Sequence, residues 1–357
     1  MKTLRRYLAS EIIVATGLVV LALVLLFSFF DMVEEMKDLG RGGYRLKNIA
    51  LHVLLRAPTH VYEVFPIAAL IGTLFALAQL VASSEYTVIR TSGVSLMRLN
   101  GALLSIGLML AAVTFVFGEF IGPPAEQFAQ RMRSLAIAGI VAQEFRSGLW
   151  VKDGYNFVNV GEVTPQSELK RIRIYEFDED YRLRTLSLAE HGTYVKDRVW
   201  SLSGVTTTTF EGDRARVQRI SELRWHSVLE PQILSMLLVK PDRMSAWSLW
   251  SYSQHLKENR QKALRYEIAL WNKLMYPLAV LVMMILAVPF ASFQKRQGGV
   301  GARIFAGIML GLGFVALGQL FRSFGLLYDW PAFLAAVIPT LLFLLLAVFL
   351  MARQERR

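Results

Sequence analysis

The sequence predicts an α-helical integral membrane protein with six membrane-spanning helices and one inserted β-rich domain. The 357 residues are 54% hydrophobic and only 19% charged, whereas soluble domains carry roughly 25% charged residues. The apolar residues gather in six long runs, each able to cross about 30 Å of hydrocarbon. Between the third and fourth runs, residues 123–267 instead mix charges with short alternating segments.

The six apolar runs hold few charges, and these lie near the ends of each run. The first run follows a basic start and could be taken for a secretion signal. It reaches full span length and ends without a small-residue cleavage site, so we expect it to be retained. The expected spans are 8–30, 61–83, 100–122, 268–293, 304–325 and 332–352. They divide the chain into a first membrane half (1–122), an inserted domain (123–267) and a second membrane half (268–357).

The bases of the short loops predict how the protein sits in its membrane, because cytoplasmic loops carry the excess of Lys and Arg. With both termini on one side, the loops on that side hold eleven bases and two acids, Glu85 and Glu355. The opposite loop 326–331 holds no base and one acid, Asp329. We therefore expect cytoplasmic termini and an inserted domain on the outer side. The net charge of +11 then reflects topology and gives little support to a nucleic-acid partner.

The inserted domain is predicted to be a β-sandwich or jelly roll. In LWVKDGYNFVNV, an Asp153-Gly154 turn separates two alternating segments, and RIRIYEF alternates bases with apolar residues. Turn signals recur up to about residue 228 at the spacing of a sandwich or barrel. A helix over 246–265 is expected to lead into the fourth span.

Motifs of common enzymes are missing from the sequence. There is no cysteine, which excludes disulfides and thiolate chemistry, and the five histidines show no metal-ligand spacing. No G-x-x-x-x-G-K-[ST], G-x-S-x-G or H-E-x-x-H occurs. We expect no catalytic residue, no metal and no cofactor in this chain.

The segment 83–93 lies between the second and third spans and is predicted to form a short helix at the membrane surface. Ser83 or Ser84 can cap it, and Glu85 suits its first turn. One reading is a coupling helix (about 84–93) that docks on a cytoplasmic motor subunit through Glu85 or Arg90. The alternative is an ordinary surface helix.

Small and polar residues mark the fifth span. Gly307-x-x-x-Gly311 permits close approach of two membrane helices, either at a partner interface or lateral gate or within this chain. Gln319 and Arg322 share one face near the outer end. An ionisable residue in a span is a functional candidate, although Arg322 can also reach the interface as an ordinary snorkelling side chain.

Four bases are expected just above the outer leaflet: Lys37 and Arg41 after the first span, and Arg131 and Arg133 after the third. Such a rim could hold the phosphates of an anionic lipid headgroup. It could also be a solvated cluster, because acids are interleaved with the bases.

Several motifs in order resemble the YjgP/YjgQ family of membrane proteins, LptF and LptG, which are the permease subunits of the lipopolysaccharide exporter. The resemblance covers essentially the whole chain. It rests on the three-plus-three layout and on the segments 84–93, 66–70, Gly118-Glu119, Glu126-Gln127 and 148–158. The last segment, GLWVKDGYNFV, is closer to the LptG branch of the family than to LptF.

The resemblance implies a Gram-negative inner-membrane permease that pairs with an LptF-like permease above two LptB-like ATPases. ATP and Mg²⁺ would be used by the ATPases, and lipopolysaccharide would pass through an LptC-like protein to an LptA-like periplasmic bridge. Family coupling and headgroup positions match Glu85, Lys37 and Arg133, whereas Asp31 and Gln130 replace expected bases. Phe65 and Phe314 fit a lipid cavity, although packing in the core is the favoured alternative.

Two other classes of function remain open. The chain could be a membrane scaffold whose outer domain recruits partners without moving a substrate. It could also be a membrane enzyme acting on envelope lipids, although no suitably spaced pair of acids predicts one.

Overall fold

The structure is a computed structural model of the 357-residue chain. It describes all residues apart from 1, 86–87, 89–90, 93–95, 138–147, 154, 165–167, 179, 197, 213, 228–239, 259–260, 294–299 and 356–357.

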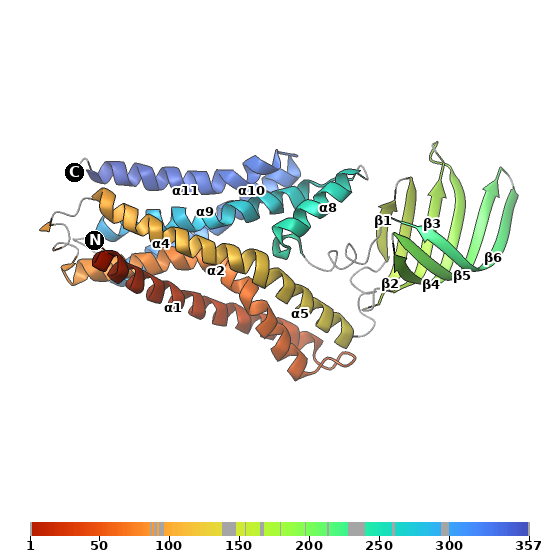
Figure 1. Ribbon diagram of the computed structural model, residues 1–357, viewed down its shortest axis with the longest axis horizontal. Helices are drawn as coiled ribbons and strands as arrows, with labels where there is room; N and C mark the ends of the chain where they lie inside the picture. The colour runs from red at the N-terminus through yellow and green to blue at the C-terminus, as the bar shows by residue number, and fades with distance from the viewer. Residues whose placement is uncertain are drawn as a thin grey trace.

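Six helices form an elongated bundle with both chain termini at one end and the β-sheet beyond the other (Figure 1). Each of the six is long and apolar enough to cross a membrane, which confirms the six-span prediction. We call the two ends of the bundle the terminal end and the sheet end. The helices are α1 (Lys2–Glu35), α2 (Leu46–Ala82), α4 (Leu96–Val116), α9 (Leu264–Phe293), α10 (Val300–Leu327) and α11 (Ala332–Glu355).

Two helices continue well past the predicted spans at the sheet end. The helix α2 begins at Leu46 rather than near residue 61, because charged and histidine residues lower the hydropathy of its first turns without breaking the helix. The helix α4 continues through a π-helix, η2 (Phe117–Ile121), into α5 (Gly122–Ala136). The predicted start of the inserted domain, residue 123, therefore lies within a continuous helical rod.

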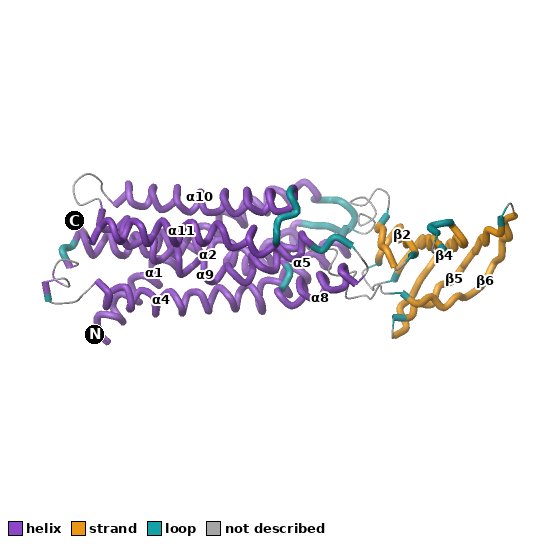
Figure 2. The backbone as a smooth tube through the Cα atoms, turned by 90° about the horizontal axis from the view of Figure 1, so that it is seen from above, coloured by secondary structure: helices purple, strands orange, loops and turns teal. Residues whose placement is uncertain are grey.

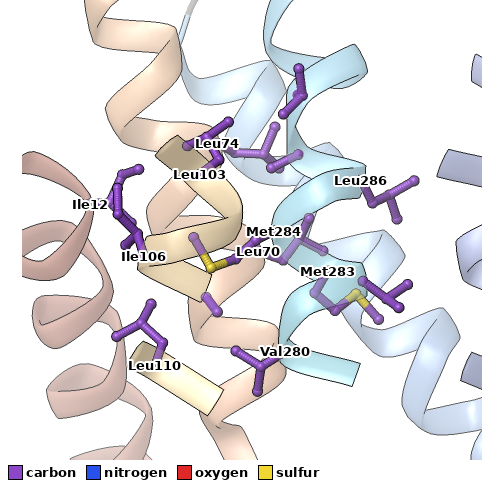
Figure 3. Close-up of a cluster of buried hydrophobic side chains, with 14 of the residues drawn as sticks. Ile12, Leu70, Leu74, Leu103, Ile106, Leu110, Val280, Met283, Met284 and Leu286 are labelled. Carbon is purple, nitrogen blue, oxygen red and sulfur yellow. The ribbon is translucent and has the colours of Figure 1, made fainter. Parts of the chain in front are cut away.

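The core of the bundle is built around α2. Its residues Leu70 and Leu74 gather with Leu103 and Ile106 of α4 and with Met283 of α9 (Figure 3). Of the apolar window of α2, 78% is buried, against 22% for α1 and 17% for α10. The outer faces of α1 and α10 therefore remain apolar and uncovered by the rest of the chain.

The inserted domain is built of β-strands, as the sequence predicts, and its described strands form one antiparallel sheet of six. Asp153 pairs with Asn156 across the first hairpin, at the predicted turn. The described strands follow one another in chain order within a single sheet, without the crossover of a Greek key. They are β1 (Leu149–Asp153), β2 (Asn156–Val163), β3 (Leu169–Phe177), β4 (Leu183–Lys196), β5 (Val199–Glu211) and β6 (Arg214–His226).

The chain returns to the bundle through a 3₁₀ turn, η3 (Pro241–Arg243), and a short helix, α8 (Ala246–Glu258). The helix predicted over 246–265 is therefore two elements, because α8 ends before α9 begins at Leu264. Viewed from the second direction, helices and strands occupy separate parts of the long axis (Figure 2). The return segment lies where these two parts meet.

Candidate functional site

A layer of buried charged residues crosses the sheet end of the bundle. Charged groups inside or beside membrane spans are costly unless they are paired, so their position calls for an explanation. Asp31 and Glu35 come from the last turns of α1, and His52, Arg56 and His60 follow at every fourth residue along α2. This spacing places the three α2 side chains on one face of the helix. We refer to these residues, together with Glu126, as the charged layer.

The centre of the layer joins three helices through Arg56. Its guanidinium lies 2.9 Å from Asp31 of α1 and 3.5 Å from Glu126 of α5. His60 lies 2.6 Å from the same Asp31 carboxylate and 3.2 Å from Glu63. Each buried charge thus faces an opposite charge, which offsets much of its desolvation.

A second group of contacts joins the sheet end of α1 to α5 and to the loop between α1 and α2. The carboxylate of Glu35 accepts hydrogen bonds from Arg133 at 3.0 Å and from the Tyr44 hydroxyl at 2.8 Å. Arg133 also reaches Asp38 at 2.5 Å. Burial, and then the neighbouring Glu35 carboxylate, raise the pKa of Tyr44 above its usual range. Tyr44 therefore acts here as a neutral hydrogen-bond donor.

The four bases predicted to form a rim fall into two groups. Arg133 is partly buried and turned toward Glu35 and Asp38. Lys37, Arg41 and Arg131 are exposed, and Arg41 reaches Asp38 at 2.6 Å. Sequence reasoning missed two further exposed bases at the same end, Arg45 and Lys47. The exposed set, which we call the basic rim, is Lys37, Arg41, Arg45, Lys47 and Arg131.

The return segment Pro241–Trp247, called here the anchor segment, collects contacts from the ends of several spans. Arg243 lies 2.9 Å from Glu126 and 3.7 Å from Glu63. Burial opposes the charge of Arg243, but Glu126 and then Glu63 outweigh burial and raise its pKa. Its neighbour Asp242 pairs with Arg322 of α10 at 2.6 Å. Two adjacent residues thus bind different spans.

Backbone groups complete the anchor segment. Lys273 of α9 donates a hydrogen bond to the carbonyl oxygen of Met244. The carboxylate of Glu119, in η2, accepts from the backbone N–H groups of Ala246 at 2.7 Å and Trp247 at 3.3 Å. A carboxylate at a helix N-terminus is favourable because it meets unpaired N–H groups and the positive end of the helix dipole. The ionisable residues at span ends therefore hold the returning chain in place.

The residues predicted to form a cavity or gate lie in different surroundings. Phe65 and Phe314 are buried in the core of the bundle. Gly307 and Gly311 face α2, where an added Cβ would come within 2.8 Å of Leu74 or Ile67. These glycines thus allow close packing within the chain.

At the sheet end of α10, Gln319 is exposed and Arg322 is partly exposed. Only Arg322 of the predicted gate residues takes part in the anchor-segment contacts described above.

The predicted coupling segment lies at the terminal end of the bundle. Backbone hydrogen bonds from Val88 to Ser84 and from Ser92 to Val88 show helical turns there. Glu85 accepts a hydrogen bond from the Tyr7 hydroxyl at 2.9 Å. Arg90 lies outside the described residues. The side chain of Val88 is 65% exposed, so part of this segment is open to a partner.

Comparison with known proteins identifies the family. A family model described as lipopolysaccharide export system permease LptF/LptG matches residues 6–353. The lipopolysaccharide export system permease protein LptG of Haemophilus influenzae is 32% identical over 354 residues, which cover 99% of each chain. The protein of the same name in Escherichia coli K12 is 32% identical over 358 residues, which cover 99% of this chain and 98% of its own.

The chain belongs to the LptF/LptG family of lipopolysaccharide export permeases. The predicted resemblance to the LptG branch is confirmed, because both relatives carry that name. The six apolar helices and the inserted antiparallel sheet fit an LptF/LptG permease. Members of this family are transport components of an export system rather than enzymes.

Proposed function

We propose that this chain is the permease subunit of an ATP-driven exporter of the ABC type. It extracts lipopolysaccharide from the outer leaflet of the Gram-negative inner membrane and passes it to a periplasmic bridge. In this proposal the termini are cytoplasmic and the β-sheet is periplasmic, as the loop bases predict.

One observation carries the proposal: an uncovered apolar helix face lies directly below a set of exposed bases. Only 22% of the apolar window of α1 is buried, and Lys37 and Arg41 follow at its sheet end. Removing acyl chains from apolar surroundings costs about 0.8 kcal/mol per CH₂ group. An apolar wall keeps that burial while the basic rim binds phosphates. This pairing suits an amphiphile with several acyl chains and a phosphorylated headgroup.

The expected partners follow from the family. An LptF-like permease would cover the open faces of α1 and α10 and complete the cavity. Two LptB-like ATPases would bind ATP and Mg²⁺ and dock below, with Glu85 and Arg90 at the contact. An LptC-like protein and an LptA-like bridge would receive the lipid.

Photo-crosslinking tests the headgroup part of the proposal. A photoreactive amino acid is placed at Lys37 or Arg131 in the complete complex and irradiated in vesicles that contain lipopolysaccharide. The matched control is Val348 of α11, an exposed apolar position near the terminal end. We expect lipopolysaccharide adducts at the rim positions, with fewer when ATP drives transfer. Equal labelling at Val348, or none at the rim, would refute the assignment.

A further inference from the structure

The helix α10 is held near its two ends by contacts of different kinds. Toward the terminal end, an added Cβ on Gly307 would come within 2.7 Å of Leu74, so α10 packs tightly on α2 there. At the sheet end, Arg322 reaches Asp242 of the anchor segment at 2.6 Å. The tightly packed apolar contact with α2 is expected to stay closed. The ion pair can open when water or another charged group takes the place of one of its two side chains.

The shortest ion pairs of Arg243 and Asp242 differ sharply in burial. Glu126 is 1% exposed and Arg243 is 18% exposed, so breaking their contact would leave a charge without water. Asp242 is 49% exposed and Arg322 is 28% exposed, and pairs of this kind contribute about 0–1 kcal/mol. The connection to α10 is therefore easier to open than the buried Arg243–Glu126 pair.

Arg322 itself is incompletely satisfied in the paired state. Its Nε atom is buried and has no hydrogen-bond partner among the described residues. A buried donor left unpaired costs about 1–3 kcal/mol. Movement of Arg322 toward water would recover that hydrogen bond, which offsets part of the loss of the Asp242 contact.

We propose that Asp242 is a positioning residue for the fifth span. Its ion pair with Arg322 holds the sheet end of α10 against the anchor segment, and each transport cycle requires this pair to open and re-form. The packed glycine contact with α2 then acts as the pivot. Because Arg243 stays bound to Glu126, the anchor segment keeps its place on α2 and α5 while α10 moves.

This inference rests on the proposed export function, since it assigns a moving part to it. The uncovered apolar face of α10 forms part of the lipid cavity in that proposal. Closing the cavity expels the lipid, and opening it admits the next one. The Asp242–Arg322 ion pair can hold α10 in place in one state of the cavity and open in the other.

Reversible cross-linking tests the inference directly, because the native chain has no cysteine. The variant D242C/R322C is assembled with its permease and ATPase partners in vesicles that contain lipopolysaccharide. A short bis-methanethiosulfonate reagent then bridges the two thiols. We expect bridging to lower ATP-dependent transfer of lipopolysaccharide to a periplasmic acceptor by about tenfold or more, and a reductant to restore it. ATP hydrolysis and complex assembly are measured on the same sample.

The matched control bridges another ion pair near the sheet end that does not involve α10. Lys257 of α8 lies 2.5 Å from Glu267 of α9, and bridging K257C/E267C should leave transfer unchanged. If bridged D242C/R322C transfers lipid at its unbridged rate, the proposed opening is wrong. If the parent complex itself transfers no lipopolysaccharide with ATP, the proposed function fails first.

Charge reversal gives a second test that does not depend on cross-linking. D242R and R322D should each lower transfer by about threefold to tenfold, and D242R/R322D should recover most of it. Melting temperatures of the purified variants show whether each one folds. Recovery in the double variant supports the pair, whereas a folded double variant no better than the singles would overturn it.

Discussion

The sheet end of the bundle carries two sets of charged residues that differ in burial and in partners. In the charged layer, Arg56 and Glu126 are almost fully buried, and each lies near opposite charges from other helices. In the basic rim, Lys37 and Arg131 are exposed to solvent. The first set joins helices through ion pairs, whereas the exposure of the second set is what the proposed binding of phosphate requires. Burial therefore separates the structural role of the charged layer from the binding role proposed for the basic rim.

The largest expected effect comes from removing an acid of the charged layer. Replacement of Glu126 by Ala leaves Arg56 and Arg243 without a shared partner, so we expect a loss of about 3–5 kcal/mol in the free energy of unfolding. Thermal unfolding of the purified protein measures it. E34A is the matched control, because Glu34 is an exposed acid near the same end of the bundle. Similar melting temperatures for E126A and E34A would contradict the distinction between the two sets.

A smaller effect is expected for Arg133, which lies between the two sets. R133Q breaks the pairs with Glu35 and Asp38, but the side chain is 31% exposed and water offsets part of the loss. We expect a destabilisation of about 1 kcal/mol. R131Q, at an exposed base two residues earlier, should change stability by less than about 0.5 kcal/mol. Equal unfolding free energies for the two variants would place Arg133 in the basic rim.

The smallest effect on stability is expected for the rim itself. K37Q should leave the melting temperature unchanged and weaken binding of lipopolysaccharide by about fivefold, because a base near an anionic lipid surface contributes about 1 kcal/mol. Binding measured at rising salt should converge for K37Q and the parent chain, since salt screens this term. A difference that persists at high salt would mean that Lys37 acts by another route.

Hydropathy and residue alternation were enough to predict the main elements of this protein. Six apolar runs and an interrupted stretch with period-two alternation gave the spans and the β insert. The charged layer could not be predicted in the same way, because His52, Arg56 and His60 made the first turns of α2 look like a loop. Their spacing of four residues was the signal that an extended helix was present.

The contacts within the site depend on residues far apart in the chain. Arg243 and Glu126 are 117 residues apart in sequence, and only the fold brings them together. Glu63, Glu119 and Lys273 were visible as charges near span ends, but their shared target, the anchor segment, was not. A single sequence shows that charged residues near span ends require opposite charges or hydrogen-bond partners. It does not show which residues supply them.

The most direct test of the account is ATP-dependent transfer of lipopolysaccharide by the assembled complex in vesicles. The measurement compares the parent chain with K37Q/R41Q/R131Q, whose melting temperature serves as the folding control. We predict that the parent complex transfers the lipid and that the triple variant loses transfer by about tenfold or more while still folding and hydrolysing ATP. Equal transfer by the two complexes, or no transfer by the parent, would contradict the account.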